Sequence, residues 1–167
     1  LRVPPIVLTF VGAALAITAV PLATAAPIGA LGCVLGAALC DALDGAVAVL
    51  TNRATRFGAW ADAIADRVAD WAFAVVLWRC GAPWELALVA GVLSMARELY
   101  RIKVPRARSI ITVDERPTRV ICTGVALLAA ASTSADWAAT VCAAVWVVLA
   151  TAGWLQFRQF RKLTVSR

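Results

Sequence analysis

Long apolar segments are the feature that most constrains how this chain can fold. Hydrophobic residues make up 62% of the 167-residue sequence, whereas an ordinary soluble domain is closer to half apolar. A helix needs about 20 largely apolar residues to cross a bilayer. The candidate spans are residues 3–22, 28–50, 59–78, 84–99, 120–131 and 137–157. We therefore predict an all-α, polytopic membrane protein with six transmembrane helices, forming a single domain over residues 1–167.

The charges of the connecting segments predict how these helices are oriented. Basic residues are frequent after the second span, between the fourth and fifth spans, and at the end of the chain. The segments after the first and fifth spans have none. Lysine and arginine collect in the cytoplasmic loops of membrane proteins. Both termini should therefore be cytoplasmic, in a multi-pass protein of the cell (plasma) membrane.

Aspartates interrupt the second and third apolar segments. They are Asp41, Asp44, Asp62, Asp66 and Asp70. A charged side chain at the bilayer centre costs ~3 kcal/mol, so these carboxylates should face the bundle interior or a water-filled cavity. Residues three or four apart share one face of a helix. A short loop joins the two segments, so we expect a helical hairpin whose aspartate rows meet in one cavity open to the cytoplasm.

Carboxylates packed this closely need a cation, because they cannot all stay ionised without one. Oxygen ligands suit Mg²⁺ or Mn²⁺. The chain has no histidine, so a general base is most readily a carboxylate. Two ions held here could clamp a phosphoryl group. Gly45, Ala48 and Gly58 leave room for a ligand beside the aspartates, although small residues also allow membrane helices to pack closely.

The residues from Asp41 to Asp66 resemble the signature of the CDP-alcohol phosphotransferase family, D-x2-D-G-x2-A-R-x8-G-x3-D-x3-D. Seven of its eight fixed positions match here. They are Asp41, Asp44, Gly45, Ala48, Gly58, Asp62 and Asp66. Val49 stands where the family has arginine.

The resemblance implies a metal-dependent transferase of phospholipid synthesis. It would move a phosphatidyl group from CDP-diacylglycerol to an alcohol and release CMP, in a bilayer, commonly as a homodimer, and with no nucleic acid among its partners. Asp66 would also be the base that takes the proton of the acceptor. The ligands of two Mg²⁺ or Mn²⁺ ions would be Asp41, Asp44, Asp62 and Asp66. The CDP pocket would be lined by Gly45, Ala48 and Gly58.

Val49 is the departure from the family pattern, and it leaves three interpretations open. The replacement could be a harmless change in a divergent subfamily. Valine cannot supply the positive charge that the family places beside the nucleotide, so donor binding could be weakened or activity lost. Alternatively, Arg53 lies one helical turn further along and could reach back to bind the CDP group.

Arginines near the cytoplasmic end of the fourth span and the start of the fifth predict the acceptor site. The candidates are Arg97, Arg116 and Arg119. The segments "RELYRIKVPRAR" and "DERPTR" resemble those of family members that use a phosphorylated alcohol. Several arginines around one pocket suit a phosphate monoester, which predicts inositol phosphate or glycerol phosphate as acceptor.

Other charged residues nearby have less specific interpretations. Arg101 and Lys103 are interpreted as topology signals or contacts to lipid headgroups. Glu115 is expected to hold one of the acceptor arginines. Asp70 is expected to pair with Arg67 or another cation of the pocket, or to be purely structural.

Two further functional classes remain open. Val49 allows a non-catalytic relative that binds a nucleotide-lipid or assembles with an active partner. A cation transporter would use the carboxylates as an ion path, but it does not explain the signature spacing. The opposite side of the membrane would have only Glu85 and Asp136 as carboxylates, which argues against such a path.

Overall fold

The computed structural model describes residues 4–50, 55–103, 115–132 and 136–165. These residues form six helices and no strand, so the all-α prediction is confirmed for the described part. The helices are α1 Pro5–Ala25, α2 Pro27–Leu50, α3 Arg56–Arg79, α4 Trp84–Lys103, α5 Arg116–Ala131 and α6 Asp136–Val165.

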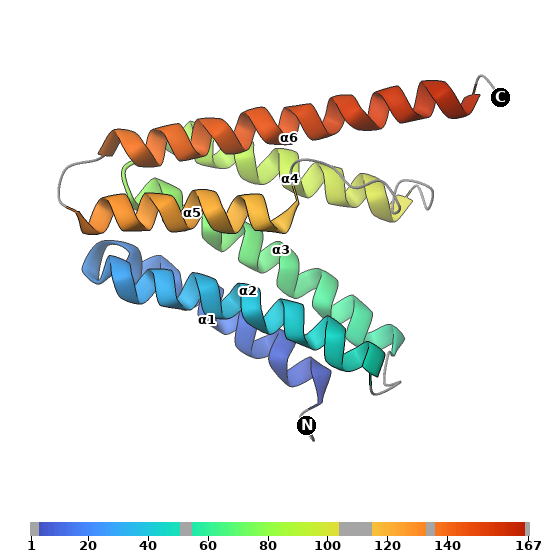
Figure 1. The fold of residues 1–167 in the computed structure, drawn as a ribbon, viewed down its shortest axis with the longest axis horizontal. Helices are drawn as coiled ribbons and strands as arrows, with labels where there is room; N and C mark the ends of the chain where they lie inside the picture. The colour runs from blue at the N-terminus through green and yellow to red at the C-terminus, as the bar shows by residue number, and fades with distance from the viewer. Residues whose placement is uncertain (1–3, 51–54, 104–114, 133–135, 166–167) are drawn as a thin grey trace.

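Helix α3 has a central place in the bundle. It packs against α1 on one side and against α4, α5 and α6 on the other, while α2 packs against α1 and α5 (Figure 1). Consecutive helices run in opposite directions. As a result, the start of α1 and the end of α6 point toward the end of the bundle at which α2 stops and α3 begins.

Local sequence signals set several of the helix ends. Pro5 and Pro27 are the first residues of α1 and α2, where a proline without an N–H costs nothing. Thr55 caps α3, because its Oγ1 accepts a hydrogen bond from the backbone N–H of Gly58 at 3.0 Å. After α3, Gly81 adopts a φ of 106°, a conformation that favours glycine after a helix.

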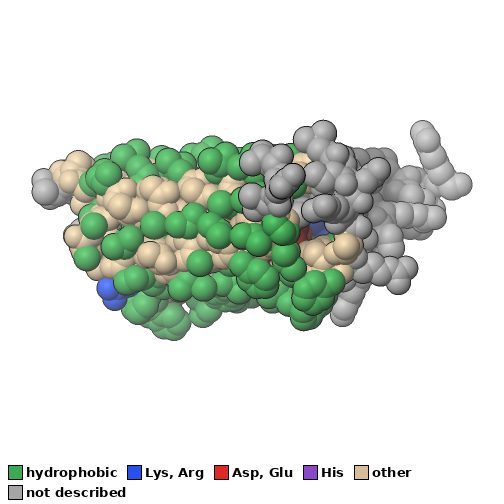
Figure 2. All heavy atoms as spheres, turned by 90° about the horizontal axis from the view of Figure 1, so that it is seen from below, with side chains coloured by type: hydrophobic (Ala, Val, Ile, Leu, Met, Phe, Trp, Pro, Cys, Tyr) green, Lys and Arg blue, Asp and Glu red, His purple; other side chains and the backbone are tan. Residues whose placement is uncertain are grey.

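The surface of the bundle is consistent with a membrane environment. Within the described residues, three helices are long and apolar enough to cross a bilayer, over Ile6–Ala25, Pro27–Val47 and Trp137–Gln156. The face on the side of α1 and α2 shows hydrophobic side chains along its length and charged ones only near the ends of the described part (Figure 2). The other three helices, α3, α4 and α5, carry ionisable residues in the bundle interior, so the prediction of six spans is not tested by their hydropathy. The cytoplasmic position of both termini also stays a prediction.

The contact between α3 and α4 depends on Gly91, and this gives a first testable prediction. A Cβ atom at Gly91 would lie 2.9 Å from Cζ3 of the Trp71 ring. We expect Gly91→Ala to lower the free energy of unfolding by about 1–3 kcal/mol, because the rigid ring has to shift. The measurement is denaturant unfolding of the purified protein in detergent.

Gly32 on α2 provides the matched control for this substitution. A Cβ there would meet nothing within 4 Å, and alanine has the better helix propensity. Gly32→Ala should therefore unfold no earlier than the parent protein. Equal unfolding midpoints for the two variants would show that the contact between Gly91 and Trp71 is not tight.

Candidate active site

A pocket lies where α1, α2, α3 and the start of α5 meet. It contains about 190 Å³ of space, part of it open to solvent. Its lining combines ionisable side chains with small residues. The lining residues are Thr9, Gly12, Ala13, Ala37, Asp41, Asp44, Asp62, Ala65, Asp66 and Arg116.

Close packing of α1 against α2 shapes one wall of this pocket. A Cβ at Gly12 would lie 3.1 Å from the Cβ of Cys40, so only glycine allows this approach without displacement. The approach brings Thr9 of α1 next to Asp44 of α2. The Thr9 hydroxyl donates a hydrogen bond of 2.6 Å to Oδ2 of Asp44, and both residues are buried.

Three carboxylates converge in this pocket. Oxygen atoms of Asp41, Asp62 and Asp66 all lie within 4.8 Å of one another. Asp41 comes from α2, while Asp62 and Asp66 are one turn apart on α3. Asp44 lines the same pocket. The donors are all hard oxygen ligands, so this set fits Mg²⁺ or Mn²⁺ and does not resemble a zinc site.

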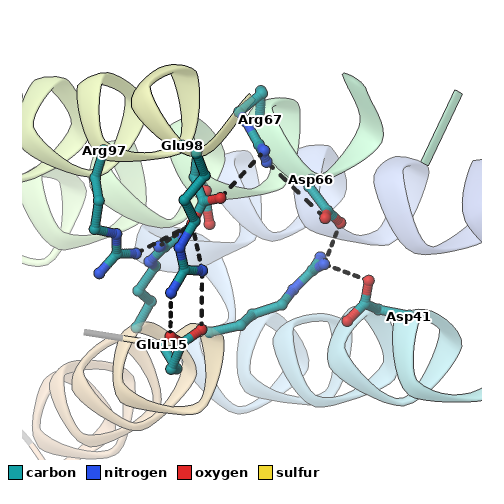
Figure 3. Close-up of polar contacts among 10 residues, drawn as sticks. Asp41, Asp66, Arg67, Arg97, Glu98 and Glu115 are labelled. Atoms are coloured by element: carbon teal, nitrogen blue, oxygen red, sulfur yellow. Dashed lines mark hydrogen bonds and ion pairs between the residues drawn. The ribbon is translucent and has the colours of Figure 1, made fainter. Parts of the chain in front are cut away.

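Arg116 lies directly against this carboxylate group. Its Nη1 donates to Oδ1 of Asp41 and to Oδ1 of Asp66, which face each other from α2 and α3 (Figure 3). Arg116 precedes the fifth apolar segment. Burial disfavours its charged form, but the neighbouring charges of Asp66 and Asp41 outweigh this, and the pKa of Arg116 is raised above its ordinary value. The guanidinium group therefore stays protonated.

Glu98 of α4 is the centre of a second polar cluster beside the first. It forms ion pairs with Arg67 at 3.7 Å, Arg97 at 3.3 Å, Arg101 at 3.4 Å and Arg119 at 3.5 Å. These arginines come from α3, α4 and α5, and Figure 3 shows Arg67 and Arg97 approaching Glu98 from different sides. One carboxylate thus ties three helices together through charge-assisted contacts.

Arg101 has ion-pair partners that the sequence did not indicate. It was predicted as a topology signal or a contact to lipid headgroups, but its guanidinium group pairs with Glu98 and, at 2.6 Å, with Glu115. The reason is that Glu115 immediately precedes α5 and lies beside the last turn of α4, which carries Arg101. The acidic residue is therefore within reach. The prediction that Glu115 holds an arginine applies to Arg101. Lys103 ends α4, and its side chain lies outside the described residues.

Asp70 pairs with Arg119 and not with Arg67. Nη1 of Arg119 donates to Oδ2 of Asp70, and both side chains are almost fully buried. Arg67 instead lies between the two clusters, 3.9 Å from Oδ2 of Asp66 and 3.7 Å from Oε2 of Glu98. Arg67 thereby connects the pocket carboxylates with the cluster around Glu98.

The residues predicted to bind CDP are only partly described. Gly45 is exposed, faces open space and is not among the described residues that line the pocket. Gly58 lies in the first turn of α3, where its N–H is used by the Thr55 cap. Ala48 and Val49 belong to the last turn of α2, but their side chains, like the whole of Arg53, lie outside the described residues.

Sequence reasoning missed two residues of these clusters. Thr9 carried no signal, because a lone threonine in an apolar segment is common. Glu98 did carry one. It lies inside the fourth apolar segment, directly after Arg97 and three residues before Arg101, and an ionisable residue in a span is a candidate for function.

A family-level comparison matches most of the chain. The family model for CDP-alcohol phosphatidyltransferase matches residues 2–159. Searches of the curated proteins and of the solved structures gave no match.

Proposed function

The chain belongs to the CDP-alcohol phosphatidyltransferase family, and from this premise we propose that it moves a phosphatidyl group from CDP-diacylglycerol to a phosphorylated alcohol. Inositol phosphate and glycerol phosphate are the acceptors we favour, and CMP is the second product. The family itself implies a transferase that uses a CDP-linked donor in a membrane and generally requires divalent metals. The observation that carries the proposal is the convergence of Asp41, Asp62 and Asp66 within 4.8 Å.

The metal-binding part of the proposal rests on the pocket carboxylates. Asp41, Asp44, Asp62 and Asp66 would hold Mg²⁺ or Mn²⁺, with two ions shared among them. When bound, the ions would neutralise the pyrophosphate of the donor and the charge that develops on CMP. The hydrogen bond from Thr9 fixes one oxygen of Asp44 and leaves the other for a ligand.

Asp66 is the residue we assign as general base. Its carboxylate lines the pocket at the level of Asp41 and is only partly buried. The acceptor hydroxyl would give its proton to Asp66 while its oxygen attacks the phosphorus that carries the diacylglycerol group. The bond from that phosphorus to the CMP oxygen then breaks, and CMP leaves with the electron pair. No histidine is present to take this proton.

The basic residues around the carboxylates support a phosphorylated acceptor. Arg116 lines the pocket, and Arg97 and Arg119 converge on Glu98 beside it. Guanidinium groups bind phosphate through paired hydrogen bonds. On the donor side, we propose that the CDP group binds along Gly45, Ala48, Arg53 and Gly58. We further propose a homodimer in the cell membrane, with the pocket facing the cytoplasm.

An assay with paired acceptors tests the proposed substrate class. Purified protein in detergent receives CDP-diacylglycerol and Mn²⁺, with glycerol phosphate against glycerol, and inositol phosphate against inositol. We expect one phosphorylated acceptor to stimulate CMP release about 10²-fold more than its neutral partner, because the site leaves charged groups unmatched without the phosphate. Equal stimulation by the neutral partner would remove the phosphate from the proposal but keep the reaction class.

Val49 is the one observation that favours a second candidate function. The family signature has an arginine at this place, and a relative without that charge could bind a CDP-linked lipid without turnover. Such a protein would bind CDP-diacylglycerol with metal, but it would release no CMP with any acceptor.

A further inference from the structure

We propose that Arg116 competes with divalent cations for Asp41 and Asp66, and that metal binding transfers its guanidinium group to the phosphate of the acceptor. Metal loading and acceptor binding would then be coupled through one side chain. This inference rests on the proposed function, because it needs both a carboxylate metal site and a phosphorylated acceptor.

The geometry of Arg116 is the first support. Its Nη1 contacts Oδ1 of Asp41 and Oδ1 of Asp66 at the same time. These two carboxylates also belong to the group whose oxygens, with those of Asp62, lie within 4.8 Å of one another. Arg116 and a metal ion would therefore draw on the same two carboxylates. Since both are positive, they also repel each other at this distance.

The other nearby arginines do not contact two of the pocket carboxylates at once. Arg119 is buried and is held by Asp70 and Glu98. Arg67 reaches only one carboxylate of the group, Asp66, and at 3.9 Å. Among the arginines that the structure describes, Arg116 is thus the one that bridges two carboxylates of the pocket.

Arg116 is also placed to move. It is the first residue of α5, its side chain is 20% exposed, and it lines the open pocket. Its long side chain can leave Asp41 and Asp66 by rotation about its own bonds, without displacement of α5. Its buried Nε has no hydrogen-bond partner in the described structure, so the ion pairs with the aspartates do not satisfy the whole guanidinium group.

Competition of this kind has a thermodynamic consequence. Metal binding frees Arg116 for a phosphate, and a phosphate that holds Arg116 removes a competitor of the metal. Each ligand must then raise the affinity of the other by the same factor. The coupling would favour joint occupancy by metal and acceptor over binding of either one alone. In the absence of both, Arg116 would keep the carboxylates neutralised.

Mn²⁺ binding to the purified full chain in detergent tests this inference without any turnover. We expect Arg116→Gln to bind Mn²⁺ about tenfold more tightly than the parent protein, because a positive charge beside the site is removed. Arg116→Lys keeps a charge but not the planar fork and should show a smaller gain. An affinity for Mn²⁺ in Arg116→Gln that is unchanged or weaker than in the parent protein would overturn the inference.

Arg79→Gln is the matched control for loss of one positive charge. Arg79 is the last residue of α3 and bonds to Thr24, far along the helix from Asp62 and Asp66. This variant should bind Mn²⁺ as the parent protein does. If it also bound Mn²⁺ about tenfold more tightly, the effect of Arg116 would be one of net charge and the inference would be wrong.

Inorganic phosphate serves as the probe for the coupling. At a fixed concentration of free Mn²⁺, phosphate should tighten Mn²⁺ binding to the parent protein but not to Arg116→Gln. The same tightening in both proteins would contradict the transfer of Arg116 to an anion.

Asp62→Asn separates failure of this inference from failure of the metal site. If Asp62→Asn leaves Mn²⁺ binding unchanged, the pocket carboxylates are not the metal site, and the proposed function loses its main support together with the inference. If Asp62→Asn weakens Mn²⁺ binding but Arg116→Gln does not tighten it, the metal site stands and only the competition is wrong.

Discussion

Asp66→Asn should lower the rate of CMP release by about 10³-fold or more, since general bases contribute 10²–10⁴-fold to typical reactions. The substitution removes the group that we assign to take the acceptor proton, and it also removes one oxygen ligand from a set that lies within 4.8 Å. The measurement is kcat for CMP release at saturating donor, acceptor and Mn²⁺. Asparagine has nearly the same size, so the pocket keeps its shape.

Two further variants make this result interpretable. Glu85→Gln removes one negative charge from an exposed position in the first turn of α4, outside the pocket, and should keep the parent rate. Asp66→Glu keeps the carboxylate but moves it, and should retain part of the activity. If Asp66→Asn folds and still turns over at a rate close to that of the parent protein, another group is the base.

Asp70→Asn should be the most destabilising of the substitutions considered. It would leave the guanidinium group of Arg119 buried without its main partner, since the side chains of Arg119 and Asp70 are only 4% and 6% exposed. Removal of one member of a buried ion pair commonly costs 3–5 kcal/mol. We expect about 3 kcal/mol, because Glu98 still faces Arg119 at 3.5 Å. Denaturant unfolding in detergent measures this loss.

Replacement of both partners distinguishes the buried charge from a general effect of mutation. Asp70→Leu combined with Arg119→Leu removes both charges together, and it should recover most of the stability, because apolar pairs of similar volume often replace buried ion pairs without loss. An Asp70→Asn protein as stable as the parent would mean that Arg119 is hydrated or held by other groups.

The aspartate spacing was the part of the site that the sequence predicted well. Helix periodicity places Asp62 and Asp66 on one face, and a hairpin brings them opposite Asp41. These relations are local, so they can be followed along the chain. The structure has these carboxylates in one pocket, and the family match over residues 2–159 agrees with the signature. The roles of the individual residues stay proposals.

The partners of the charged residues could not be predicted in the same way. Whether Arg116 approaches Asp41, or Arg101 approaches Glu115, depends on how α5 packs against α2 and on where its first residues lie relative to the end of α4. That packing is set by contacts between segments far apart in the chain. From the sequence, Arg101 was placed in a loop because the fourth apolar segment was predicted to end at residue 99. In the structure α4 continues to Lys103, and this extension directs Arg101 toward Glu98.

Membrane spans are also harder to recognise from the sequence where they depend on tertiary contacts. α1 and α2 are apolar along most of their lengths and are recognised as spans from composition alone. α3 has no such clear signal, because it carries Asp62, Asp66 and Asp70 on the face that packs inside the bundle. A helix whose polar residues face protein or a cavity is tolerated at membrane depth, but only tertiary structure shows where those residues point.

The stoichiometry of the proposed reaction can be measured with purified protein. Purified protein is given CDP-diacylglycerol and the acceptor panel while free Mn²⁺ is raised from zero, and both CMP and the acceptor-linked lipid are quantified. We expect equal amounts of the two products, which disappear when a chelator removes the metal and return when metal is restored. A folded protein that binds CDP-diacylglycerol with metal but forms neither product would refute the proposed transferase activity and favour the non-catalytic alternative that Val49 leaves open.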